Sequence, residues 1–102
     1  MNKDLKQLRE LIIDIYGIDP CMPVIKLSKL GLIVSPTKAE IYHIILAQTV
    51  AIKHLNYMAK DICSIFGNVS RVQTWRNATI TIERMRTDEY LRNDFNELIS
   101  EL

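Results

Sequence analysis

The sequence predicts an all-α protein, a compact bundle of five or six helices that forms one domain over residues 1–102. Apolar residues recur every three or four positions in several stretches, which is typical of the buried faces of helices. Only three glycines and three prolines occur, too few for the many turns of a sandwich or barrel. Hydrophobic residues make up 48% of the chain, which is enough for a folded core.

The first expected helix covers residues 3–16 and ends at Gly17, which favours a helix stop. Its apolar face is formed by Leu5, Leu8, Leu11, Ile12 and Ile15. Residues 21–34 then mix apolar side chains with Pro23 and Gly31, and predict a short helix or an irregular connection. We expect this apolar segment to be covered by the other helices or by a second subunit, so it is a candidate homodimer or partner surface.

The longest expected helix begins near residue 35 and runs to about Leu55. Ser35 is one candidate N-cap, and Thr37 with Glu40 matches a capping box one register later. The predicted core face carries Ile41, Ile44, Ile45, Gln48, Ala51, Ile52 and Leu55. The predicted edge or outer face carries His43, Thr49 and Lys53.

Residues 59–86 predict a short helix, a tight turn at Gly67 and a longer helix that Ser70 caps. Ile62 and Phe66 are four residues apart and should share one side of the short helix. The longer helix is expected to bury a stripe in which Trp75 is the core anchor; its members are Val72, Trp75, Thr79, Ile82 and Met85.

After Arg86, Thr87 is expected to cap a last helix whose first residues, Asp88 and Glu89, suit the positive end of its dipole. Its predicted apolar stripe is Tyr90, Leu91, Phe95, Leu98 and Leu102.

Charge is segregated along the chain although the formal net charge is only +1. Residues 69–86 hold four arginines and one acid, whereas residues 87–102 hold five acids and one arginine. A uniformly basic surface is therefore excluded, and any affinity for nucleic acid must come from one edge of the molecule.

The polar face of the helix from Ser70 to Arg86 suits base edges and phosphates of double-stranded DNA. The residues expected to face the major groove are Arg71, Gln73, Thr74, Arg76 and Asn77. The residues expected to contact phosphates are Lys53, Lys60, Ser70 and Arg84. The segment thus predicts a helix–turn–helix whose second helix, about residues 70–86, binds DNA.

Other classes of function find little support in the sequence. The possible metal ligands Cys21, His43, His54 and Cys63 have spacings that fit no usual zinc pattern, and no nucleophile or phosphate-loop motif is present. We expect no cofactor, no metal and no enzymatic activity. No stretch approaches the ~20 apolar residues of a membrane span, and the start lacks a signal peptide, so a cytoplasmic location is expected.

Three segments resemble the C-terminal DNA-binding domain of the bacterial replication initiator DnaA, a relative of the Trp repressor fold. They are Leu46–Leu55 (LAQTVAIKHL), Lys60–Asn68 (KDICSIFGN) and Asp88–Leu102 (DEYLRNDFNELISEL). A fourth point of likeness is the helix that follows the second segment and ends in Ile82-Glu83. The resemblance covers residues 35–102 and implies a helix–turn–helix core, preceded in residues 1–34 by a helix and an apolar connection. The signature with which that family reads its origin box is replaced here by residues 69–75, so its base-specific residues do not carry over.

Two functions follow as hypotheses. The first is a DNA-binding protein that acts as a stand-alone regulator of replication or transcription. The alternative is a protein-interaction module, a small inhibitor or adaptor that keeps the fold without reading DNA; the near-neutral net charge and the replaced signature favour it.

Overall fold

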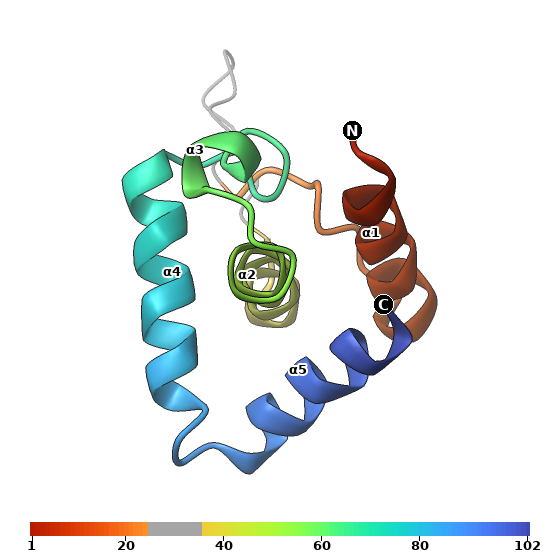
Figure 1. Cartoon of the computed structure of the whole chain (residues 1–102), viewed down its shortest axis with the longest axis vertical. Helices are drawn as coiled ribbons and strands as arrows, with labels where there is room; N and C mark the ends of the chain where they lie inside the picture. Colours follow the sequence, from red (N-terminus) through yellow and green to blue (C-terminus); the bar gives the residue numbers. More distant parts are fainter. Residues whose placement is uncertain (25–35) are drawn as a thin grey trace.

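The computed structural model describes residues 1–24 and 36–102, and all regular secondary structure in that part of the chain is helical. The helices there are α1 (Lys3–Tyr16), α2 (Lys38–Lys53), α3 (Ala59–Ile62), α4 (Arg71–Arg84) and α5 (Glu89–Glu101). The prediction of an all-α fold is confirmed. Figure 1 looks almost along α2 and shows the other helices arranged around it, with α4 on the left, α1 on the right and α5 below.

Helix α2 is the centre of the molecule. Its consecutive residues from Leu46 to Ala51 are all buried, which is typical of a helix enclosed on every side. The prediction of a single core face is therefore wrong for Thr49, which was expected at the edge. The hydroxyl of Thr49 has a hydrogen-bond partner, because it donates to the carbonyl of Ile45 at 2.8 Å.

Side-chain caps set the starts of α2, α4 and α5, largely as the sequence indicates. Thr37 accepts a hydrogen bond from the backbone of Glu40, and the Glu40 carboxylate accepts one from the backbone of Thr37, so the predicted capping box is confirmed. Ser35 and residues 25–34 of the predicted partner surface lie outside the described residues. The cap of α5 is Asp88 rather than Thr87, because its carboxylate accepts from the backbone N–H of Leu91 at 3.0 Å.

Helices α1 and α5 complete the core on the side of α2 away from α4 (Figure 1). Leu8 and Ile12 of α1 and Leu98 of α5 are fully buried in one apolar cluster with α2. Two residues predicted on these apolar faces are exposed instead, Ile15 at 38% and Tyr90 at 85%. Neighbouring helices do not cover either residue, so the predicted apolar stripes of α1 and α5 are wider than the surfaces that these helices bury.

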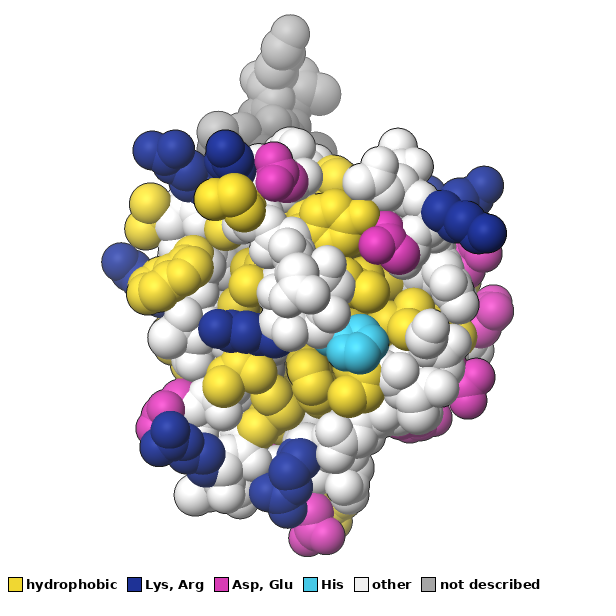
Figure 2. All heavy atoms as spheres, viewed as in Figure 1, with side chains coloured by type: hydrophobic (Ala, Val, Ile, Leu, Met, Phe, Trp, Pro, Cys, Tyr) yellow, Lys and Arg dark blue, Asp and Glu magenta, His cyan; other side chains and the backbone are white. Residues whose placement is uncertain are grey.

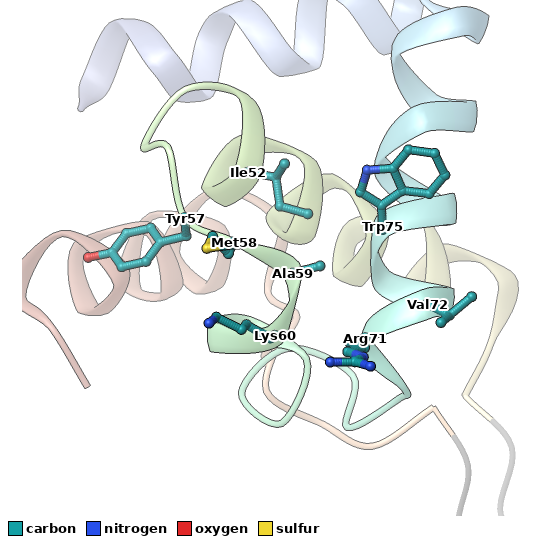
Figure 3. A pocket seen from close by; sticks show the side chains of 8 residues that line it. All are labelled: Ile52, Tyr57, Met58, Ala59, Lys60, Arg71, Val72 and Trp75. Atoms are coloured by element: carbon teal, nitrogen blue, oxygen red, sulfur yellow. The ribbon is translucent and has the colours of Figure 1, made fainter.

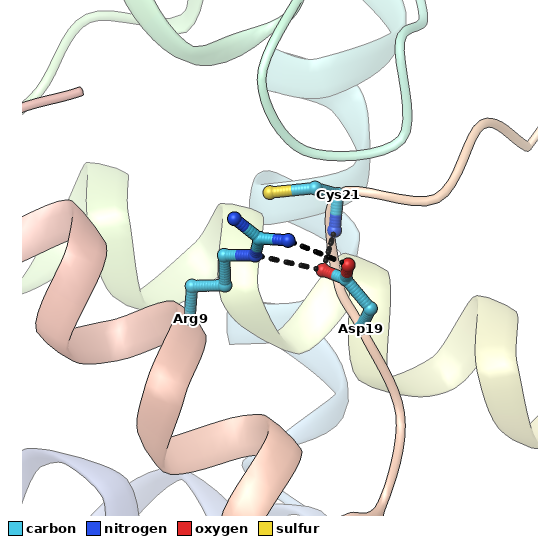
Figure 4. A network of polar contacts seen from close by, with 3 residues as sticks. All are labelled: Arg9, Asp19 and Cys21. Atoms are coloured by element: carbon cyan, nitrogen blue, oxygen red, sulfur yellow. Dashed lines mark hydrogen bonds and ion pairs between the residues drawn. The ribbon is translucent and has the colours of Figure 1, made fainter.

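A polar cluster holds the segment after α1 against that helix (Figure 4). The guanidinium of Arg9 donates to both carboxylate oxygens of Asp19, at 3.1 and 2.8 Å, and the backbone N–H of Cys21 donates to Asp19 at 2.9 Å. The bonds from Arg9 hold the pKa of Asp19 below its usual value, and burial raises the pKa of the Cys21 thiol. The role of this cluster is structural, since its bonds hold the segment after α1 in place.

Candidate nucleic-acid interface

Helix α4 packs against α2 through small residues. Thr74, Ala78 and Thr81 are spaced three or four apart and are at most 5% exposed. Their short side chains let α4 approach α2 closely, and these two helices share the most extensive contact in the described structure. The threonine hydroxyls are satisfied inside α4, since Thr74 donates to the carbonyl of Ser70 and Thr81 to that of Asn77.

This packing corrects the predicted buried stripe of α4. Val72 and Trp75 are 57% and 58% exposed, so Trp75 is not the core anchor. The buried stripe of Thr74, Ala78 and Thr81 has the same helical period as the predicted one but lies on a different side of α4. The sequence did not indicate that it is buried, because two of its three residues are threonines. Thr79 of the predicted stripe is exposed as well, whereas Ile82 and Met85 are half-buried and Met85 packs against the core cluster.

Because a different side of α4 faces α2 than predicted, the predicted DNA-contacting residues differ in their exposure. Thr74 is fully buried, so its predicted place on the exposed face is wrong. Asn77 is half-buried and lies toward α2. The remaining seven are exposed: Lys53, Lys60, Ser70, Arg71, Gln73, Arg76 and Arg84.

The turn before α4 has the predicted glycine in the left-handed conformation, with φ +80° at Gly67. A Cβ on Gly67 would lie only 2.8 Å from the Cγ2 atom of Ile44, so α2 also requires glycine there. Helix α3 is shorter than predicted and ends at Ile62, but the backbone N–H of Phe66 still donates to the Ile62 carbonyl at 3.1 Å. Ile62 and Phe66 are both fully buried, as their spacing predicts.

A chain of side-chain amides connects this turn to the surface of α4. Gln48 is buried in α2 and donates through Nε2 to the carbonyl of Phe66 at 2.9 Å, while its Oε1 accepts from Asn77 at 3.0 Å. The Oδ1 atom of Asn77 accepts in turn from Nε2 of Gln73 at 2.7 Å. Because the carbonyl of Phe66 only accepts, it fixes the orientation of all three amides in sequence. The side-chain amide of the exposed Gln73 is therefore fixed in orientation by hydrogen bonds that lead through Asn77 to the buried Gln48.

The exposed cations of α4 lie on different sides of the helix. Arg71 lines a groove together with Lys60, whereas Arg84 lines a second hollow, beside Lys38. Within residues 1–24 and 36–102, none of the exposed predicted cations makes an ion pair within 4.0 Å. Figure 2 shows Lys and Arg side chains along the α4 side of the molecule, interleaved with apolar surface and a few acidic side chains. The opposite edge carries several acidic side chains and, at its upper end, further Lys or Arg side chains.

Sequence reasoning missed two features of this region. Gln48 stands out in the sequence as an amide among mostly apolar residues, but its two partners, Phe66 and Asn77, are 18 and 29 positions away in the chain. The groove beside α4 was hidden because Trp75 and Val72 were assigned to the core. Its lining is Ile52, Tyr57, Met58, Ala59, Lys60, Arg71, Val72 and Trp75 (Figure 3).

The described residues contain no group of three or more His, Cys, Asp or Glu side chains placed to hold a metal ion. No helix in this part of the chain is long and apolar enough to cross a membrane. Comparison of the chain with protein-family models, curated proteins and solved structures finds no match. The resemblance to the initiator's DNA-binding domain therefore remains a prediction from the sequence.

Proposed function

We propose that this chain binds double-stranded DNA through α4, with α3 and α4 as its helix–turn–helix, and acts as a stand-alone cytoplasmic regulator of replication or transcription. The observation that carries the proposal is the outer surface of α4. Only one side of α4 is used by the core, and the exposed remainder presents Gln73 and Arg76. Lys60 and Arg71 lie near its first turns and make no ion pair within residues 1–24 and 36–102. A rigid helix with such an outer face suits entry into a major groove.

The roles of these residues follow from their chemistry. Arg76 is suited to a bidentate contact with guanine, and Gln73 to a contact with adenine through its amide, whose Oε1 is not used by the chain of amides. Lys60 is suited to a phosphate beside the first turn of α4, and Lys53 is a further phosphate candidate at the end of α2. Arg71 lines the groove with Lys60, so it is suited to a phosphate there rather than to the base contact expected from the sequence. The Ser70 hydroxyl, which already accepts from the Gln73 backbone, keeps its proton for a further acceptor. Arg84, at the last turn, is suited to a phosphate farther along the duplex.

The test is binding to duplex DNA across a series of salt concentrations. Replacing Arg71 and Arg76 by alanine should weaken binding about tenfold or more at low salt and reduce the magnitude of the slope of log K against log salt concentration by about 1, because of the two only Arg71 is assigned to a phosphate. The matched control removes two positive charges from α1 with Lys3→Ala and Lys6→Ala, and should change the slope little. Equal effects of the two double variants would mean that α4 is not the contact surface.

A selection from random duplexes with the intact chain would then give the preferred sequence. If Gln73 and Arg76 read bases, the Arg76→Ala variant should lose preference at one or two positions, at a cost of about 1–3 kcal/mol each. An unchanged preference would limit α4 to phosphate contacts.

A further inference from the structure

A groove between α2 and α4 exposes apolar side chains that the proposed DNA contacts do not use. It has a volume of about 470 Å³ and lies between the end of α2, residues 57–60 and the first turns of α4. In Figure 3, Ile52 and Trp75 lie toward one end of the groove and Lys60 and Arg71 toward the other. Three of its large apolar side chains are more than half exposed: Met58, Val72 and Trp75.

These three side chains contribute little to the fold. Helix α4 is held by Thr74, Ala78 and Thr81, and Trp75 and Val72 point away from that contact. Tryptophan, methionine and arginine are the residue types enriched where one protein binds another, and an exposed tryptophan in a hollow is a frequent anchor of binding energy. An apolar groove between two helices is also the usual receptor for an amphipathic helix.

The charge of the groove defines the partner further. Its lining includes the cations Lys60 and Arg71 and no carboxylate among the described residues, and neither cation is paired within them. Acidic side chains beside the apolar anchors would therefore meet complementary charge. The acidic helix α5 of a second copy does not supply such a segment, because its apolar residues Leu91 and Leu98 are already buried in its own core.

We propose that this groove binds an acidic amphipathic helix of a partner protein. The apolar face of that helix covers Trp75, Val72 and Met58, and its carboxylates pair with Lys60 and Arg71. The same two cations contribute to the proposed DNA surface, so partner and DNA compete for the chain. The inference stands without the DNA function, since the groove and its charges are independent of what Gln73 and Arg76 contact.

The test uses Trp75, which is the sole tryptophan of the chain and so reports directly on the groove. The probe is a synthetic helical peptide with Leu and Phe on one face and Glu on the other; the control peptide has Lys in place of every Glu. We expect the acidic peptide to shift the Trp75 emission to shorter wavelength in a saturable titration, and the lysine peptide to bind about tenfold or more weakly. Equal binding of the two peptides, or no saturable shift with the acidic one, overturns the proposal.

Variants locate the contact. Lys60→Glu with Arg71→Glu should weaken the acidic peptide about tenfold or more, and Val72→Ser should also weaken it. Ile80→Ser is the matched control, because Ile80 is an exposed apolar residue of α4 that lines the other hollow. All these positions are exposed, and circular dichroism checks that each variant is folded. Equal loss in the Ile80 variant, or saturable quenching of Trp75 by single-stranded DNA with no response to the acidic peptide, would contradict the assignment.

Discussion

Gly67 joins the turn before α4 to the central helix, and two constraints meet at this one residue. Its φ of +80° lies in the left-handed region, which costs an L-residue about 1–2 kcal/mol. Its Cα also faces α2 so closely that a methyl group would lie 2.8 Å from Ile44 and 3.1 Å from Nε2 of Gln48. A larger residue would therefore disturb the amide chain that holds Gln73.

The substitution Gly67→Ala should lower the free energy of unfolding by about 2–5 kcal/mol, the sum of backbone strain and overpacking. Gly17→Ala isolates the first cause, because Gly17 also has a positive φ of 69° but has open space around its Cα. It should cost only about 1–2 kcal/mol. Urea unfolding measures both. Equal losses in the two variants would show that the contact with α2 is not tight.

Helices α2, α4 and α5 begin at side-chain caps, whereas Asn2 before α1 makes no such bond. The capping box of α2 is the most complete, since Thr37 and Glu40 each satisfy a backbone N–H of the other. This helix is the one around which the others pack, so the bonds that fix its first turn act on the whole core.

Replacing Thr37 by alanine should lower the free energy of unfolding by about 1 kcal/mol, because the Glu40 N–H loses its acceptor. Thr37→Ser keeps the hydroxyl and should cost much less. Thermal unfolding followed by circular dichroism distinguishes them. A serine variant as unstable as the alanine variant would mean that the methyl group, rather than the cap, stabilises this end.

At the scale of the whole molecule, aromatic side chains tie α1, α2 and α5 together. The ring of Tyr16 lies against His43, with centroids 4.1 Å apart, and Tyr42 donates to the carboxylate of Asp94 at 2.7 Å. The hydroxyl of Tyr16 is buried and has no hydrogen-bond partner among the described residues. Burial, followed by the negative charges of Asp94 and Glu97, raises the pKa of Tyr16 to about 12.

The raised pKa predicts a loss of stability in alkali. Tyr16 is neutral when protonated, so a folded-state pKa above the unfolded value of about 10 stabilises the fold fully below pH 10. That contribution should fall as the pH rises from about 10 to 12, where the unfolded chain releases the proton first. Burial and the bond to Asp94 also raise the pKa of Tyr42, which acts in the same direction.

Denaturant unfolding at several pH values tests this sign. Tyr16→Phe should make the alkaline loss shallower without lowering stability at pH 7, because it removes a hydroxyl that has no partner. Tyr42→Phe should lower stability at pH 7 by about 1.5–3 kcal/mol, through loss of its bond to Asp94. An alkaline profile that is unchanged by Tyr16→Phe would assign the loss to other groups.

The all-α class, the approximate extent of the longer helices, the left-handed Gly67 and the caps at Thr37 and Ser70 could be predicted from the amino-acid sequence. These features depend on local spacing and on hydrogen bonds between residues close in the chain, so a pattern of a few residues is enough to predict them.

The side of α4 that faces α2, and with it the composition of the candidate site, could not be predicted from the sequence because it depends on the packing of the two helices. Thr74, Ala78 and Thr81 form as regular a stripe as Val72 and Trp75, and the choice between them depends on how closely the central helix approaches. The small residues are the ones that face α2, because their short side chains let the backbones of α2 and α4 pack closely. Because α4 faces α2 with this side, Thr74 is buried and is lost as a predicted DNA contact. Trp75 is exposed for the same reason and lines the groove.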